Sequence, residues 1–217
     1  TPLHVTLFLI SIFLLSFFIT LGVKSNPPHS KLNKTIIIDA GHGGIDTGTH
    51  HKNILEKDIN LAIAKKLANL LDRGNTKIIM TRNKDKLYQD DRNKDISYRA
   101  KLVKKSSADI LVSIHVNSFP SKKSFGGQTF YKPNSKESKK LASAIQEQLI
   151  KIQPKNYRKI KSAPYYILRK SNIPAIITEV GFISNPEDRN RISSPKEQTK
   201  IAQAICEGII NYFNNNL

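Results

Sequence analysis

The feature that most constrains the fold is a run of β-branched residues that leads directly into a glycine-rich turn. Thr35 to Ile38 suit a strand buried on both faces, as the strands of parallel sheets are. The turn after it, Ala40 to Gly44, carries glycines that let the backbone bend sharply and one histidine, His42. Because open α/β sheets bind their ligands at the carboxyl ends of strands, we expect chemistry at His42.

Two further apolar runs also end on polar residues. Ile110 to Ile114 predicts a second buried strand, which ends at His115 with Asn117 just beyond it. Ile173 to Val180 predicts another, and this otherwise apolar run contains Glu179. A buried carboxylate is costly unless it has a partner or a task, so Glu179 is a candidate for function. We therefore expect these strand ends to bring their polar residues to one edge of a sheet.

Helical spacing of apolar residues separates the strand-like runs, which indicates the α/β class. Two helix starts have capping signals, at Asn134 and in the box Ser194 to Glu197, where proline occupies the first helical position. Tyr98, Leu102 and Val103 are predicted to face inward. The predicted helices cover Glu56 to Gly74, Ile96 to Ser107, Asn134 to Lys151 and Ser194 to Phe213, and the further strands cover Lys77 to Met80, Phe125 to Tyr131 and Tyr165 to Leu168. Surface loops are predicted over Ile45 to Ile54, Arg82 to Asp95, Pro154 to Pro164 and Gly181 to Ser193.

The N-terminal region is distinct from the rest. Val5 to Val23 contains no charged residue and is about as long as a membrane helix of ~20 residues. We expect residues 1–23 to be a membrane anchor, with a cleaved signal segment as the alternative. Residues 24–34, with two adjacent prolines, are predicted to be a linker, and residues 35–217 a single catalytic domain.

The composition favours an anionic partner but does not indicate which class of anionic molecule it is. The formal net charge of +18 would draw the chain towards a polyanion. The lysines are spread along the chain and there is no tryptophan, so the usual pattern of a nucleic-acid binder is missing and nucleic acid is not an expected partner. Cys206 is the sole cysteine, which excludes an internal disulfide and a cysteine-based zinc site; we interpret it as a small apolar helix residue.

The candidate chemistry rests on four residues, His42, Glu56, His115 and Glu179. Two imidazoles and a carboxylate form a recurring zinc set with one open position, and a second carboxylate can then move the proton of a water. The spacing lacks the compact His-Glu-x-x-His pattern of one metalloprotease class. A structural histidine, or a Glu56 that merely favours the positive end of its helix, remains the alternative. Two residues near the same edge, Arg82 and Asn117, are candidate substrate contacts or ordinary surface residues.

Six blocks follow one another along the chain: IIIDAGHGG, LEKDINLAI, Thr81-Arg82, ADILVSIHVNS, GGQTFY and ITEVGFISNPED. Together they resemble the zinc-dependent N-acetylmuramoyl-L-alanine amidases of the type 3 family. The resemblance implies a mixed α/β fold, with a central, mostly parallel sheet flanked by helices, and hydrolysis of the amide between the lactyl group of muramic acid and L-alanine. It also implies Zn²⁺ as cofactor, with His42, Glu56 and His115 as ligands and Glu179 as the catalytic carboxylate. Ala40 stands where the family usually has proline.

One apolar segment followed by one catalytic domain is similar to the spore-cortex, or germination-specific, amidases of that family. This similarity implies that peptidoglycan glycan strands with their peptide stems are the substrate, and that muramic δ-lactam forms after cleavage. It places the domain outside the cytoplasm, membrane-anchored or secreted, in the space between the forespore membranes. An accessory protein is a further candidate partner. The alternatives are a non-catalytic cell-wall-binding domain of the same fold and a membrane-tethered binder of polyanions.

Overall fold

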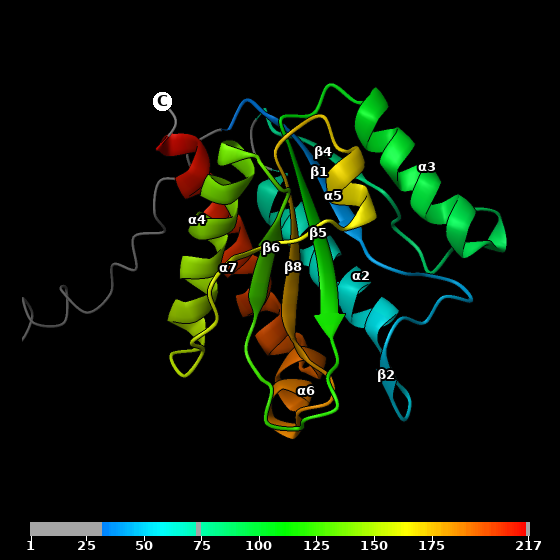
Figure 1. Ribbon diagram of the computed structural model, residues 1–217, viewed down its shortest axis with the longest axis vertical. Helices are drawn as coiled ribbons and strands as arrows, with labels where there is room; N and C mark the ends of the chain where they lie inside the picture. The colour runs from blue at the N-terminus through cyan, green and yellow to red at the C-terminus, as the bar shows by residue number, and fades with distance from the viewer. Residues whose placement is uncertain (1–31, 73–74, 216–217) are drawn as a thin grey trace, which may run out of the picture. The chain divides into compact units, whose positions relative to one another are not determined.

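The computed structural model describes residues 32–72 and 75–215, which form a helix-flanked sheet (Figure 1). Six strands of this part of the chain pair in the order β4-β1-β5-β8-β6-β7. The pairs β4/β1, β1/β5 and β5/β8 are parallel, whereas β6 runs antiparallel to β8 and parallel to β7. The predicted class, a mixed and mostly parallel α/β sheet, is confirmed. The strands are β1 (Thr35–Ala40), β4 (Lys77–Met80), β5 (Ile110–Asn117), β6 (Gln128–Tyr131), β7 (Lys161–Ser162) and β8 (Ala175–Phe182).

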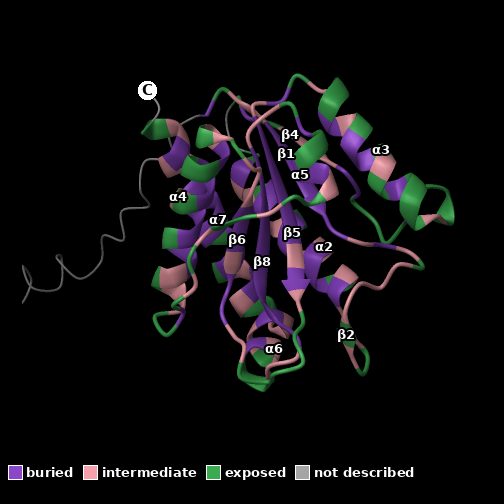
Figure 2. Cartoon of the chain, in the orientation of Figure 1, coloured by how far each residue is buried: buried purple, intermediate pink, exposed green. Residues whose placement is uncertain are grey.

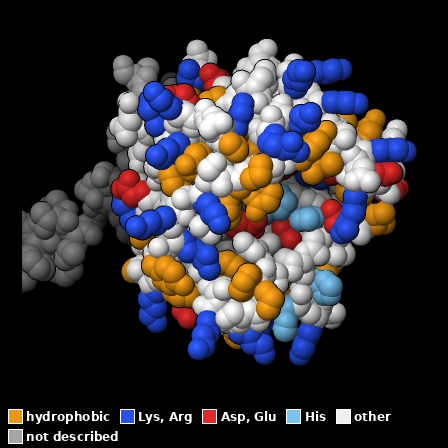
Figure 3. Space-filling model, in the orientation of Figure 1, with side chains coloured by type: hydrophobic (Ala, Val, Ile, Leu, Met, Phe, Trp, Pro, Cys, Tyr) orange, Lys and Arg blue, Asp and Glu red, His pale blue; other side chains and the backbone are white. Residues whose placement is uncertain are grey.

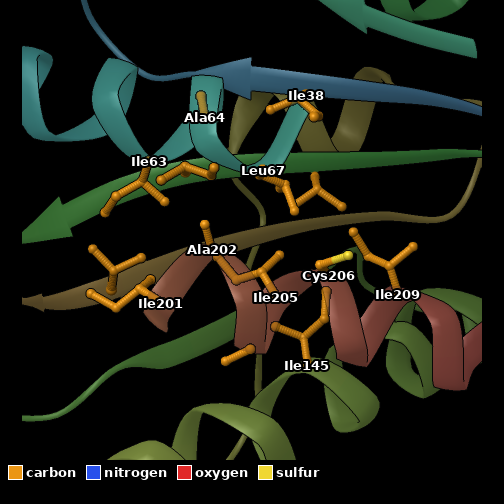
Figure 4. Close-up of a cluster of buried hydrophobic side chains, with 14 of the residues drawn as sticks. Ile38, Ile63, Ala64, Leu67, Ile145, Ile201, Ala202, Ile205, Cys206 and Ile209 are labelled. Atoms are coloured by element: carbon orange, nitrogen blue, oxygen red, sulfur yellow. The ribbon is translucent and has the colours of Figure 1, made fainter. Parts of the chain in front are cut away.

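Three long helices cover one face of the sheet with the larger core. They are α2 (Glu56–Leu71), α4 (Lys136–Ile152) and α7 (Pro195–Asn214), and each presents one apolar stripe to the strands. Figure 2 shows this as buried bands on the inner side of each helix. The side chains interlock between α2, α4, α7 and the sheet, as Figure 4 shows for Ile38, Ile63, Leu67, Ile205 and Ile145 among others. Cys206 is a buried member of this core, as expected.

The opposite face is covered by fewer residues. Among the described residues, only α3 (Arg92–Lys105) and the short α5 (Tyr166–Lys170) pack there, over nine buried residues compared with 29 in the larger core. Side chains alternate along a strand, so the residues that share this face with Ile37, Leu111 and Ile177 include Asp39, Ser113, His115 and Glu179. The thinner face therefore carries the polar residues of the strand ends.

Three predicted segments differ from the structure. Tyr165 to Leu168, expected to be a strand, lies at the start of helix α5, because a four-residue apolar run fits a helix turn as well as a strand. The edge position of the sheet is taken instead by β7, inside the predicted loop Pro154 to Pro164. The second half of the predicted loop Gly181 to Ser193 is helix α6 (Pro186–Ser193), capped by the Asn185 side chain with proline in the first turn.

Several boundaries and caps also differ. Helix α3 starts at Arg92, four residues earlier than predicted, because the Asp91 side chain accepts from two amides of its first turn. Ser135 rather than Asn134 caps α4, and Ser194 precedes α7 without a side-chain cap bond. Tyr98 does not face inward: it is 37% exposed and stacks on Tyr88.

Short elements occupy two predicted loops, and one predicted strand is shorter. The loop before α2 forms a hairpin, β2 (His50–His51) with β3 (Ile54–Leu55). A 3₁₀ turn, η1 (Tyr88–Asp90), lies in the loop before α3. The strand predicted to start at Phe125 starts at Gln128.

Leu32 is already buried against the core, and its carbonyl accepts a hydrogen bond from the Thr76 hydroxyl at 2.6 Å. The domain thus begins slightly before the predicted Thr35. The predicted anchor at 1–23, most of the linker at 24–34 and Gly74, the predicted helix end, lie outside the described residues. Within residues 32–72 and 75–215, no helix combines the length and the apolar character of a membrane span.

Candidate active site

Three polar side chains that come from separate elements meet at the carboxyl edge of the sheet. His42 follows β1, Glu56 is the first residue of α2, and His115 lies near the end of β5. One ligand atom from each lies within 4.8 Å of the other two. Glu56 Oε1 is 3.2 Å from His42 Nε2 and 3.1 Å from His115 Nδ1. Two imidazoles and one carboxylate at this spacing fit a zinc ion and leave a fourth coordination position for water or substrate.

Buried hydrogen bonds hold Glu56 in place. Its Oε1 accepts from the backbone amide of Val116 at 2.9 Å and from Asn60, and its Oε2 accepts from the amide of Thr49 at 2.8 Å. Burial alone would raise the pKa of Glu56, but hydrogen bonds and charge from His115 and His42 lower it well below its usual range. Glu56 is therefore ionised at neutral pH, as a metal ligand must be.

His42 is oriented by both its ring and its backbone. It has a left-handed backbone conformation (φ 63°), which is uncommon outside glycine. Its Nδ1 lies 2.8 Å from Asp46 Oδ2, which leaves Nε2 for a metal, and its carbonyl accepts from Arg99 at 2.8 Å. Asp46 in turn accepts a hydrogen bond from Arg92. A carboxylate behind a ligating histidine fixes the ring orientation and makes it a better donor.

His115, like His42, is only partly buried, with 23% of its side chain exposed. Burial would lower its pKa, but the hydrogen bond and charge of Glu56 raise it to about 9. In the absence of a metal it thus carries a proton at neutral pH, and a metal ion competes with that proton.

Glu179 lies directly opposite His115 in the β5/β8 register. It is 9% exposed, and its Oε2 has no hydrogen-bond partner among the described residues. Burial raises its pKa to about 7, because the charge of His115 does not fully offset the lost solvation. A carboxyl group that titrates near neutral pH beside a metal position is suited to accept and return a proton.

A buried charge network under the turn is the feature that the sequence analysis missed. Asp39 accepts from Ser113 at 2.5 Å, Thr81 at 2.7 Å and Arg99 at 2.8 Å. Arg99 also donates to Asp95 and to the carbonyls of Ala40 and His42. The one available signal was Asp39 itself, a carboxylate within a buried strand. The network fixes the backbone on both sides of Gly41.

Asp39→Asn is expected to destabilise the fold by about 3–5 kcal/mol at pH 7, because one partner of a buried ion pair is lost. Burial would raise the pKa of Asp39, but Arg99, His115 and the hydroxyl donors lower it to about 2. Its stabilising contribution is therefore present above the unfolded pKa of 3.8 and lost as pH falls towards 2. Chemical denaturation measures the change, with the exposed Asp58→Asn as control; a loss below about 1 kcal/mol would contradict the assignment.

The site opens into a pocket on the thinner face. Figure 3 shows histidine and acidic side chains at the bottom of a hollow in the middle of this face, with apolar and basic side chains around it. The pocket has a volume of about 380 Å³, within the ~300–1,000 Å³ range of ligand pockets. His42 and His115 line one end, and Tyr165 and Tyr166 lie on one wall. The pKa of Tyr165 is raised, mainly by burial and to a smaller extent by the charge of Glu179.

Comparison with known proteins identifies the family. The family model described as N-acetylmuramoyl-L-alanine amidase matches residues 36–211. The chain belongs to this amidase family. The germination-specific N-acetylmuramoyl-L-alanine amidase of Bacillus subtilis (strain 168) is 36% identical over 189 residues, which cover 83% of this chain and 80% of that protein.

Solved amidase structures have the same fold. The CwlD amidase from Clostridioides difficile, in complex with the GerS lipoprotein, superposes with a TM-score of 0.81 at 38% identity, over 84% of this chain and 99% of that one. The N-acetylmuramoyl-L-alanine amidase from Clostridium difficile 630 gives a TM-score of 0.78 at 34% identity, over 85% and 98%. The resemblance noted in the sequence, most of all to the germination-specific amidases, is confirmed.

Of the two predicted substrate contacts in this amidase, Arg82 is turned away from solvent. It is 3% exposed and donates to the carbonyls of Ala40, Gly41 and Lys57 at 2.8–2.9 Å. We therefore interpret Arg82 as a support for the His42 turn. Asn117 ends β5 at the open edge, where its side chain accepts from the Ser118 amide at 2.7 Å; its contact with substrate stays a prediction.

Proposed function

We propose that the chain is a zinc-dependent amidase that hydrolyses the amide between the lactyl group of N-acetylmuramic acid and L-alanine of peptidoglycan stem peptides. The carrying observation is the convergence of His42, Glu56 and His115 with the buried carboxyl of Glu179 in register beside them. A non-catalytic wall-binding domain of the same fold is disfavoured, because binding alone gives no reason to keep Glu179 buried without a partner.

The residues of the site have separate roles in hydrolysis. When bound, zinc supplies a Lewis acid and lowers the pKa of a coordinated water to about 7. His42, Glu56 and His115 would hold it, while Asp46 fixes the His42 ring. Glu179 takes a proton from the attacking water and returns it to the leaving alanine nitrogen, which its near-neutral pKa permits. Because Glu179 is buried, few solvent molecules compete for that proton.

Mass spectrometry of muropeptides incubated with zinc-loaded full-length protein tests this proposal. We expect stems released with a free L-alanine amino group and muramic acid left with its lactyl carboxylate. A chelator should abolish release and added zinc should restore it. Cleavage at any other bond would contradict the substrate assignment, and binding without products would favour the wall-binding domain.

We further propose that the cleavage serves spore-cortex maturation, after which muramic δ-lactam forms. Similarity to the germination-specific amidase supports this role. The chain would then act outside the cytoplasm, between the forespore membranes, with residues 1–23 as membrane anchor or signal segment, residues 24–34 as linker and residues 35–217 as catalytic domain. An accessory lipoprotein is a candidate partner, since the related CwlD was solved in complex with one. Spores that lack the protein should lack muramic δ-lactam; normal lactam content would contradict the role.

A further inference from the structure

The pocket beside the metal ligands lies between the first turns of α3 and the start of α5. Asp39 and Ile177 form its floor on the sheet. Arg92, Asn93 and Ile96 line the α3 side, opposite Tyr165, Tyr166 and Ile167 on the α5 side. The pocket exists because these two helices cover the face only in part. A group bound at the metal position can thus extend into the pocket over the sheet.

Two arginines line the pocket, and they differ in how far their guanidinium groups are already hydrogen-bonded within the protein. Arg99 is buried and its guanidinium donates to Asp39, Asp95 and two backbone carbonyls. Arg92 has a side chain that is 65% exposed, and it contacts Asp46 at the mouth of the pocket. Among the described residues its guanidinium hydrogen-bonds to Asp46 alone, so the other donors of its five-donor fork are available to a ligand. Arg92 is therefore the pocket cation that can bind an arriving carboxylate.

The shape of the substrate indicates which half enters this pocket. A glycan strand continues on both sides of each muramic acid, so it must lie across an open edge. A stem peptide is a side branch and can enter a pocket end-on. The floor and walls offer apolar and aromatic side chains, including Ile96, Ile177 and Tyr166, which suit a short peptide backbone with small side chains.

We propose that this pocket binds the stem peptide and that Arg92 binds a free carboxylate on the residue after L-alanine. The assignment rests on the proposed function and adds a specificity-determining residue to it. Reach supports it: two hydrogen-bonded contacts, His42 to Asp46 and Asp46 to Arg92, separate the guanidinium from the ligand imidazole. The length of this path is comparable with the span of two residues of extended chain, about 7 Å.

Two synthetic N-acetylmuramoyl dipeptides test the proposal. They differ only at the residue after L-alanine, which bears either a free carboxylate or a carboxamide. We expect the wild-type, zinc-loaded full-length protein to prefer the carboxylate by about 10- to 100-fold in kcat/KM, the range of a hydrogen bond to a charged group. Arg92→Gln should abolish this preference, mainly through a higher KM for the carboxylate substrate. Arg92→Lys should restore part of it, and Lys101→Gln, farther along α3, should leave it unchanged.

The ratio of the two rates separates this role from an indirect one. Arg92 also contacts Asp46, so a disturbance of His42 would slow both dipeptides equally and leave the preference intact. That result, or a wild-type protein with no preference, would overturn the assignment of Arg92. Cleavage of either dipeptide at the lactyl amide upholds the proposed amidase function whether or not Arg92 selects the carboxylate. The experiment therefore tests the proposed function and the role of Arg92 separately.

Discussion

Glu179→Gln is expected to lower kcat by about 10²- to 10⁴-fold, the usual contribution of a positioned acid-base group. The amide has the shape of the carboxyl group but cannot take a proton from water or return it to the leaving nitrogen. Zinc content should not change, because Glu179 is outside the proposed ligand set of His42, Glu56 and His115. Muropeptide release and metal analysis on the same preparation measure both outcomes.

Glu207→Gln provides the matched control, since it makes the same exchange at an exposed position of α7. It should leave both activity and metal content unchanged. Full activity in Glu179→Gln would remove Glu179 from the mechanism, whereas loss of zinc would move it into the ligand set.

In the zinc-free protein, the effect of Glu179→Gln on the free energy of unfolding is expected to depend on pH. The pKa of Glu179 rises from 4.5 to about 7 on folding, so the folded state binds more protons than the unfolded state between these values. The contribution of Glu179 to stability is thus complete below pH 4.5 and is lost as pH rises through about 7. Relative to wild type, Glu179→Gln should gain up to about 3 kcal/mol between pH 4.5 and 8. Denaturation at several pH values would show it, and a pH-independent difference would contradict the burial argument.

The convergence of His42, His115 and Glu179 could be predicted because parallel strands simplify the problem. His42 and His115 each follow or end a β-branched run, and Glu179 interrupts a third. All three runs are buried parallel strands, so their carboxyl ends meet at one edge whatever their order in the sheet. Glu56 needed the family pattern, since a glutamate at a helix start is also explained by the helix dipole.

Other features depended on long-range contacts that local patterns do not record. Asp39 and Arg99 are 60 residues apart, and nothing near either residue indicates that they pair. Arg82 followed a strand like the functional residues, yet its guanidinium is used by backbone carbonyls of the neighbouring turn. The apolar run of helix α5 is too short for its spacing to distinguish a helix from a strand. The pocket between α3 and α5 was therefore invisible before the fold was known.

His42→Ala should remove the metal. With one ligand lost, two donors remain, and we expect zinc affinity to fall by more than the about 10- to 100-fold typical of losing an outer hydrogen-bond partner. Asp46→Asn tests that lesser effect, because Asp46 contacts His42 Nδ1 without belonging to the ligand set. His50→Ala, on the exposed hairpin β2–β3, is the matched histidine control and should bind zinc as wild type does.

Competition titrations with a zinc chelator should rank the variants as wild type equal to His50→Ala, then Asp46→Asn, then His42→Ala. Wild-type affinity should also rise with pH towards about 9, because zinc must displace the proton that Glu56 stabilises on His115. Unchanged zinc binding in His42→Ala would refute the ligand set. If Asp46→Asn matched His42→Ala, Asp46 would be a ligand itself, and the metal would lie closer to Arg92 and the stem pocket than the geometry of Glu56 indicates.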